Sequence, residues 1–148
     1  MSAEDTFRSY LDAFNRADVD AITLLYAAST SVRNPFSPTP LMTRDEVRAF
    51  VSPMFAAYRD VTAVVEDVLT DGRRLAARLR IRARHVGALA APTGTVEGTG
   101  RLVDMRTAEF LRVDDDGLIV EHERIFDSAA VLAQLRAEHL GTGRDPAR

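Results

Sequence analysis

The segment 75–85 limits the possible folds of this chain more than any other part of the sequence. Within it, apolar residues alternate with arginines. The odd positions hold Leu75, Ala77, Leu79, Ile81, Ala83 and His85, and the even positions from 78 onward hold Arg78, Arg80, Arg82 and Arg84. A period of two is that of a β-strand, in which successive side chains point to opposite faces. We therefore expect a sheet with one buried face and one charged, exposed face.

The first third of the chain has apolar residues at helical spacing. It predicts three helices, capped by Ser2, Asp18 and Thr43, the last within a Thr-x-x-Glu capping box. Their apolar positions are Phe7, Tyr10, Leu11 and Phe14; Val19, Ile22, Leu25 and Tyr26; and Val47, Phe50, Val51, Met54, Phe55 and Tyr58. We expect a short strand at 31–33 and a loop at 34–40, because closely spaced prolines cannot form a helix interior.

The second half of the chain has strand patterns. The predicted strands cover 61–69, 75–85, 102–113 and a last segment ending at Asp127, with a loop or loose hairpin over 88–101 and a turn at Asp114–Gly117. A short helix capped by Ser128 follows, and 141–148 is expected to be a flexible tail. Helices followed by strands define an α+β fold. We expect a single domain over 1–140, in which a curved, cone-shaped antiparallel sheet packs against about three N-terminal helices.

The composition excludes several classes of function. The 148 residues carry a formal net charge of −3 and include three histidines and no cysteine. Without cysteine there is no thiol nucleophile, zinc finger or iron–sulfur cluster, and we expect no metal and no cofactor. The mild negative charge argues against nucleic-acid binding. The N-terminus has no apolar leader and no segment approaches the ~20 apolar residues of a membrane helix, so we expect a cytoplasmic protein without membrane association.

The predicted hairpin around Asp114–Gly117 places ionisable residues on the apolar face of the sheet. If Val113 lies opposite Leu118, the facing pairs are Glu109 with His122, Thr107 with Arg124, and Met105 with Phe126. Glu109, His122 and Arg124 then share the buried face with His85. Charged groups on such a face require an explanation, because ionisable side chains are seldom buried without partners.

Two interpretations of these buried groups are equally open. In the first they form an acid/base site: burial raises the pKa of Glu109, which donates a proton, while His122 or His85 accepts one. Arg124 would bind a developing oxyanion or a carboxylate. In the second, Glu109, His122 and Arg124 only satisfy one another, and His85 is a structural core histidine.

The opposite face of the sheet carries charges of both signs. It holds the arginine row together with Arg106, Arg112, Glu121 and Glu123. Such side chains can pair across strands or between two copies of the chain. Because acids lie between the arginines, this face does not predict nucleic-acid binding.

Several segments resemble the NTF2-like small enzymes, which include ketosteroid isomerases and SnoaL-like polyketide cyclases. The segments are Tyr10–Ile22, Tyr26, Val32–Pro35, Arg84–Gly87, Thr99–Gly100, Glu109–His122, Asp127 and Leu132–Leu135. The resemblance covers about residues 5–136. It implies a cystatin-like α+β barrel, a cone with one deep pocket, and a homodimer.

The resemblance also implies roles for individual residues. Tyr10 and Glu109 match the hydrogen-bond donors that ketosteroid isomerases direct at the substrate oxyanion, the acid being protonated there. Asn34 lies where those enzymes have an aspartate base, and an amide cannot accept a proton at neutral pH. Arg124 lies where aldol-type SnoaL-like cyclases have an acid/base aspartate. Asn34 and His85 match residues of that subfamily.

The leading hypothesis is therefore a SnoaL-like enzyme that cyclises or isomerises a hydrophobic, oxygenated small molecule without a cofactor. The expected catalytic residues are Tyr10, His85, Glu109, His122 and Arg124, and the expected substrate-binding residues are Phe14, Tyr26, Asn34, Met54, Phe55, Tyr58, Met105, Thr107 and Phe126. One alternative is an epoxide hydrolase or epoxide-opening cyclase of the same fold. Another is a module that binds a ligand or partner without catalysis.

Overall fold

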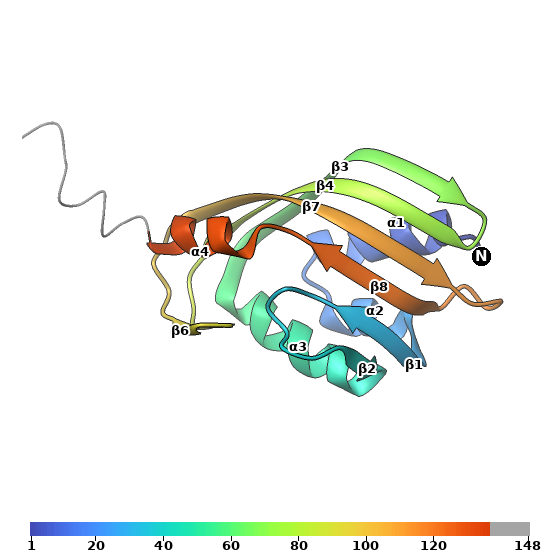
Figure 1. Cartoon of the computed structure of the whole chain (residues 1–148), viewed down its shortest axis with the longest axis horizontal. Helices are drawn as coiled ribbons and strands as arrows, with labels where there is room; N and C mark the ends of the chain where they lie inside the picture. Colours follow the sequence, from blue (N-terminus) through green and yellow to red (C-terminus); the bar gives the residue numbers. More distant parts are fainter. Residues whose placement is uncertain (137–148) are drawn as a thin grey trace, which may run out of the picture.

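A computed structural model of the chain describes residues 1–136 and shows a curved sheet folded around helices (Figure 1). The elements are α1 (Ala3–Asn15), α2 (Val19–Leu24), β1 (Tyr26–Arg33), β2 (Leu41–Thr43), α3 (Arg44–Ala57), β3 (Tyr58–Asp71), β4 (Arg74–His85), β5 (Leu89–Ala91), β6 (Gly94–Val96), β7 (Leu102–Val113), β8 (Ile119–Ile125) and α4 (Ser128–Arg136). The main sheet has the order β2-β1-β8-β7-β4-β3, and β5 and β6 form a separate hairpin. This confirms the α+β class and the curved sheet. The pairing is antiparallel except between β1 and β8, which run parallel.

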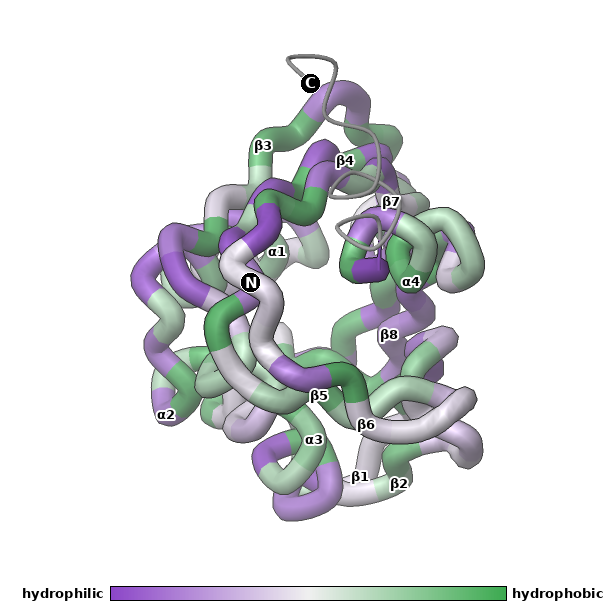
Figure 2. The backbone as a smooth tube through the Cα atoms, turned by 90° about the vertical axis from the view of Figure 1, so that its left-hand side faces the viewer, coloured by the Kyte–Doolittle hydropathy of each residue, from purple (hydrophilic) through white to green (hydrophobic). Residues whose placement is uncertain are grey.

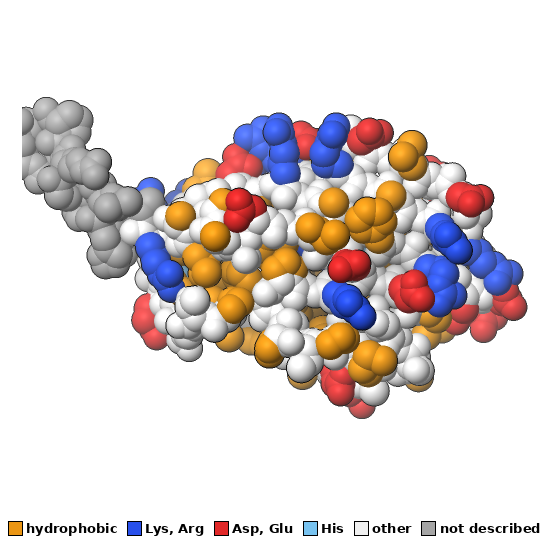
Figure 3. Space-filling model, viewed as in Figure 1, with side chains coloured by type: hydrophobic (Ala, Val, Ile, Leu, Met, Phe, Trp, Pro, Cys, Tyr) orange, Lys and Arg blue, Asp and Glu red, His pale blue; other side chains and the backbone are white. Residues whose placement is uncertain are grey.

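The alternating segment forms β4 and separates the two faces of the sheet as predicted. Its inner side chains are buried, with Leu79 0% and Ile81 2% exposed, whereas its arginines lie on the outer face. In Figure 2 the elements form a ring, with β4, β7 and β8 on one side and α3 and β1 on the other. Figure 3 shows the outer face, where arginine side chains gather along the upper edge and hydrophobic side chains lie nearer the middle. The buried side chains of β4 therefore lie on the inner face of the sheet.

The helix starts follow the predicted caps, with two corrections. Ser2 and Asp5 form a capping box, and Asp18 accepts a hydrogen bond from the backbone of Ala21. Thr43 caps α3, but Glu46 accepts from the backbone N–H of Met42 and so does not complete the capping box. The start of α4 is capped by Asp127, whose carboxylate accepts from the Ala130 N–H, and not by Ser128. None of the helices within residues 1–136 is long and apolar enough to cross a membrane.

Two tyrosines assigned to helices begin strands instead. Tyr26 starts β1, which is longer than the strand predicted at 31–33, and Tyr58 starts β3. Their apolar spacing continues the helical pattern, but pairing with distant strands determines their conformation. Tyr26 pairs with Ile119 of β8, and Tyr58 pairs with His85 of β4. Tertiary pairing thus overrides a local periodicity.

The register of the β7–β8 hairpin differs from the predicted one by two residues. Glu109 lies opposite Arg124 and Leu111 lies opposite His122, so the predicted pairings of Glu109 with His122, Thr107 with Arg124, and Met105 with Phe126 are wrong. One residue of this difference arises at the turn, where Val113 lies opposite Ile119 and not Leu118, and the second arises from an irregularity between Arg112 and Val113. Because side chains alternate with a period of two, the two-residue shift keeps Glu109, His122 and Arg124 on the buried face.

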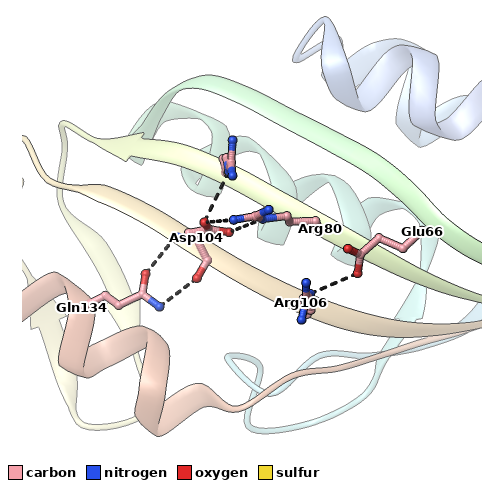
Figure 4. A network of polar contacts seen from close by, with 6 residues as sticks. Glu66, Arg80, Asp104, Arg106 and Gln134 are labelled. Carbon is pink, nitrogen blue, oxygen red and sulfur yellow. Dashed lines mark hydrogen bonds and ion pairs between the residues drawn. The ribbon is translucent and has the colours of Figure 1, made fainter.

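The helix α4 is attached to β7 by the side chain of Gln134 (Figure 4). Its Oε1 accepts from the Asp104 backbone N–H and its Nε2 donates to the Asp104 carbonyl, each over 2.8 Å. The last pairing of β8 with β7 is Ile125 with Ala108, so the described part of the chain gives the Asp104 backbone no strand partner on that side. The carboxylate of Asp104 meanwhile accepts from Arg80 and Arg82 of the outer face. Gln134 therefore takes the place of a missing strand and fixes α4 against the sheet.

Replacing Gln134 with alanine should lower the free energy of unfolding by about 1–3 kcal/mol, because two hydrogen bonds to a backbone without other partners are lost. Urea unfolding would measure the change. The control is Arg8→Ala, which removes an exposed helix ion pair and should change stability by less than about 0.5 kcal/mol. Equal effects of the two variants would contradict the role given to Gln134.

Candidate active site

Five polar side chains from four elements meet on the inner face of the sheet. They are Tyr10 of α1, Tyr26 of β1, Glu109 of β7, and His122 and Arg124 of β8. None is more than 7% exposed, and Glu109 is 0% exposed. We refer to these five residues as the buried network.

Glu109 and Arg124 form the ionic centre of the buried network. Arg124 Nε donates to Glu109 Oε2 over 2.6 Å, and Arg124 Nη2 donates to Oε1 over 3.2 Å. The same Nη2 also donates to the Tyr10 hydroxyl over 3.2 Å. The centroid of the Phe14 ring lies 5.2 Å from the guanidinium carbon of Arg124, which adds a cation–π contact. No hydrogen bond joins Nη1 of Arg124 to any residue in 1–136, so this nitrogen keeps its donors.

His122 connects Glu109 to Tyr26. Its Nε2 lies 2.8 Å from Glu109 Oε1, and its Nδ1 lies 2.7 Å from the Tyr26 hydroxyl. An ionised carboxylate only accepts hydrogen bonds, so Nε2 is the donor to Glu109. In the neutral imidazole, Nδ1 then accepts a hydrogen bond from the Tyr26 hydroxyl group. The result is a carboxylate–imidazole–hydroxyl chain, the arrangement that lets an imidazole take a proton from a hydroxyl group.

The ion pair reverses the expected titration of Glu109. Burial alone would raise its pKa, but Arg124 and His122 stabilise the carboxylate and lower the pKa to about 2. The expectation of a proton-donating Glu109 is therefore wrong, because the sequence did not show that Arg124 lies directly opposite. Burial raises the pKa of Tyr10 and that of Tyr26, so both phenols stay protonated at neutral pH.

A cavity of about 290 Å³ opens between α3, the loop after β1, the β5 strand and α4. Its lining residues are Asn34, Phe36, Ser37, Pro38, Ala49, Phe50, Pro53, Met54, Tyr58, Leu89, Ala90, Met105, Arg124, Phe126 and Val131. Arg124 is the one charged residue among these described lining residues. Two smaller hollows of about 30 Å³ each also have Arg124 and Met54 in their walls. Arg124 is thus the point at which the buried network reaches the cavity.

The predicted site residues divide into four groups by position. Asn34, Met54, Tyr58, Met105, Phe126 and Arg124 line the main cavity, Tyr10, Tyr26 and His122 line one hollow with Asn34, and Phe14 and Phe55 line the other with Tyr58. Glu109, Thr107 and His85 line none of these spaces. Glu109 belongs to the site through Arg124 and His122, whereas Thr107 is fully buried without a hydrogen-bond partner among residues 1–136.

His85 lies apart from the buried network. Its Nδ1 is 3.3 Å from the Thr99 hydroxyl, its ring packs against Tyr58, and its Nε2 has no hydrogen-bond partner in the described part of the chain. Burial lowers the pKa of His85 and favours the neutral ring. The backbone of His85 also bonds Gly100 and Arg101. These contacts support its interpretation as a structural histidine at the base of the segment that carries β5 and β6.

The sequence prediction missed much of the apolar wall. Phe36 and Pro38 come from the proline-rich segment after β1, Leu89 and Ala90 come from β5, and Val131 comes from α4. Phe36 packs edge-on against Phe126, with ring centroids 5.4 Å apart. The sequence did contain one signal for this wall, the aromatic Phe36 within the proline-rich segment 34–40. Closely spaced prolines make such a loop rigid, so an aromatic side chain in it keeps a fixed position. No sequence pattern indicated that β5 would fold over the cavity.

Asn34 is held in a defined orientation at the cavity. Its Oδ1 accepts from the Phe36 backbone N–H over 2.9 Å, while its Nδ2 has no partner among residues 1–136. Asn34 and Arg124 both line the cavity, and Nδ2 of Asn34 and Nη1 of Arg124 are the donors that their hydrogen bonds within residues 1–136 leave unused. No cluster of three or more potential metal-ligating side chains occurs in the described residues.

The profile of the SnoaL-like polyketide cyclases matches residues 4–135. The chain therefore belongs to this family. A comparison with curated protein sequences finds no match.

Solved structures support the same fold. IdmH from Streptomyces antibioticus, a proposed polyketide cyclase, is 29% identical, with a TM-score of 0.73 over 92% of this chain and 99% of that chain. A proposed SnoaL-like polyketide cyclase from Jannaschia sp. CCS1 is 20% identical, with a TM-score of 0.79 over 91% and 92% of the two chains. SalBIII, an epoxide hydrolase/cyclase-like enzyme described for pyran ring formation in the polyether salinomycin, is 16% identical, with a TM-score of 0.68 over 84% and 90%.

The ion pair of Glu109 should make stability depend on pH in acid. The pKa of Glu109 falls from an ordinary 4.5 to about 2 on folding, so its contribution of about 3 kcal/mol is complete above pH 4.5 and is lost as the pH falls toward 2. Urea unfolding of the wild type and of Glu109→Gln should differ most above pH 4.5 and converge toward pH 2. A difference that is constant over this range would contradict the lowered pKa.

Proposed function

We propose that this protein is a cofactor-independent enzyme that cyclises or isomerises a hydrophobic, oxygenated small molecule through an enol or enolate. The observation that carries the proposal is the position of Arg124. This buried guanidinium, held by Glu109, is the one charged group that residues 1–136 place in the wall of an otherwise largely apolar cavity. Fixed hydrogen-bond donors in a site with little water stabilise a developing oxyanion strongly, because they need no reorganisation during the reaction.

The buried network can also move a proton. Tyr26 and His122 line the hollow that Arg124 shares with the main cavity. A carbon acid that is bound in the main cavity and reaches into this hollow beside Arg124 would give its proton to the Tyr26 oxygen while the Tyr26 proton passes to His122 Nδ1. Glu109 would stabilise the resulting imidazolium over the 2.8 Å hydrogen bond. In this scheme Arg124 binds the substrate oxygen, His122 is the base acting through Tyr26, and Glu109 orients both.

A ligand-binding module without chemistry is the second candidate, and one observation favours it. The bonds of Arg124 to Tyr10 and Glu109, and of His122 to Glu109 and Tyr26, satisfy most polar atoms of the network without a ligand. Epoxide opening has less support, because the Glu109 carboxylate does not line the cavity. Incubation with styrene oxide in ¹⁸O-labelled water would detect hydrolytic opening through incorporation of the label.

Enolisation can be tested without knowing the natural substrate. The protein should accelerate exchange of the α-protons of 2-tetralone in D₂O above the rate in buffer, as measured by NMR. Arg124→Gln and His122→Ala should each reduce this acceleration by roughly 10²-fold, the usual effect of removing an oxyanion donor or a positioned base.

The matched control is Arg112→Gln, the same substitution on the outer face, where Arg112 pairs with Glu121. This variant should exchange 2-tetralone at the wild-type rate. Tight binding of 2-tetralone without accelerated exchange would favour the non-catalytic module. Acceleration that survives both Arg124→Gln and His122→Ala would contradict the assigned roles.

A further inference from the structure

The charge of Arg124 is already compensated within the protein. Its Nε lies 2.6 Å from a Glu109 oxygen, and this carboxylate is 0% exposed. Among residues 1–136, the pair forms no other ion pair except the contact of Glu109 with His122. A ligand at Nη1 therefore meets a guanidinium whose positive potential is largely cancelled from behind.

An anionic ligand would not be well accommodated by such a site. A permanent negative charge at Nη1 would share one guanidinium with Glu109, and the two anions would repel each other in surroundings of low polarity. The cavity wall contains no second cation among the described residues, since its remaining members are apolar or uncharged. The net charge of the ligand, Arg124 and Glu109 together would be negative, and burial penalises such a charge.

A neutral oxygen acceptor fits the same groups. The unused donors at the cavity are Nη1 of Arg124 and Nδ2 of Asn34, and the Tyr58 hydroxyl makes no hydrogen bond to residues 1–136. Burial raises the pKa of Tyr58 to about 12, so this hydroxyl keeps its proton at neutral pH. A ketone or ester oxygen accepts hydrogen bonds from such donors without bringing a charge into the cavity.

We infer that the cavity selects an uncharged carbonyl compound, a hydrophobic ketone or ester, over the carboxylate of the same shape, because Glu109 cancels the charge of Arg124. The inference rests on the proposed function, since it names the substrate class for the same site. It assigns Glu109 a role in specificity besides orienting His122 and Arg124. The negative charge on the substrate oxygen develops only during the reaction, and the proton that His122 takes up in the same step adds a compensating positive charge next to Glu109. A carboxylate ligand brings its charge without that proton.

The test compares two probes of nearly identical shape, 2-acetylnaphthalene and 2-naphthoate. Their dissociation constants are measured by fluorescence at pH 8, above the range in which histidine side chains ordinarily titrate. The wild type should bind the ketone at least tenfold more tightly than the carboxylate. In Glu109→Gln the charge of Arg124 is no longer cancelled, and the preference should reverse in favour of 2-naphthoate.

The control is Glu121→Gln, which removes the same charge from the outer face, where Glu121 pairs with Arg112. It should keep the wild-type preference. If Glu109→Gln does not fold, the double variant Glu109→Gln/Arg124→Gln replaces it. If Glu109 cancels the charge of Arg124, removing both charges should leave the ratio of the two dissociation constants within about threefold of the wild-type ratio. If instead Arg124 attracts anions in the wild type, the double variant should bind 2-naphthoate at least about tenfold more weakly than the wild type does.

Three results would overturn the inference: equal or tighter binding of 2-naphthoate by the wild type, an unchanged preference in folded Glu109→Gln, or no binding of either probe. Because these measurements concern binding alone, they separate the inference from the proposed function. Tight, selective binding of the ketone together with failure of the exchange experiment would leave the inference standing and overturn only the catalytic proposal.

Discussion

The buried ion pair between Glu109 and Arg124 is the interaction on which the site depends. A carboxylate and a guanidinium on the inner face of a sheet are tolerated only together, because either one alone would leave an uncompensated charge among apolar side chains. Once paired, they fix their neighbours. Arg124 orients the Tyr10 hydroxyl, and Glu109 determines which nitrogen of His122 carries the proton. The order of the whole network therefore follows from one pair of opposed residues.

Strand register is what brings that pair together. Glu109 and Arg124 face each other because the β7–β8 hairpin contains an irregularity next to its turn. A hairpin without it would follow the turn geometry alone and place another residue opposite Glu109. The sheet then curves around α1, so that Tyr10 reaches the same point from the other side. Local backbone geometry near Val113 thus has a direct effect on the electrostatics of a site several residues away.

The sequence predicted the faces of the sheet better than the contacts across it. Alternation in β7 and β8 was sufficient to place Glu109, His122 and Arg124 on the buried face, because a period of two survives a two-residue shift. The same pattern contains no information on register, so the partner of Glu109 and the direction of its pKa shift were both mispredicted. Tyr26 and Tyr58 were assigned to helices because their spacing is helical, and only pairing with β8 and β4 shows otherwise.

The site combines a cationic donor with an amide at positions where the resemblance to related enzymes would place acids. Asn34 and Arg124 can donate hydrogen bonds at the cavity but cannot accept a proton there. In the proposed reaction, proton transfer is therefore left to the chain of Tyr26, His122 and Glu109, whose carboxylate does not line the cavity. The two tasks of such a site are to accept the proton of the substrate and to stabilise the enolate that results. They conflict when one carboxylate faces the substrate, because its negative charge would repel the enolate. In the proposed enzyme, a cavity whose wall carries donors, with the carboxylate of Glu109 outside that wall, would stabilise negative charge on the substrate oxygen while the base stays nearby.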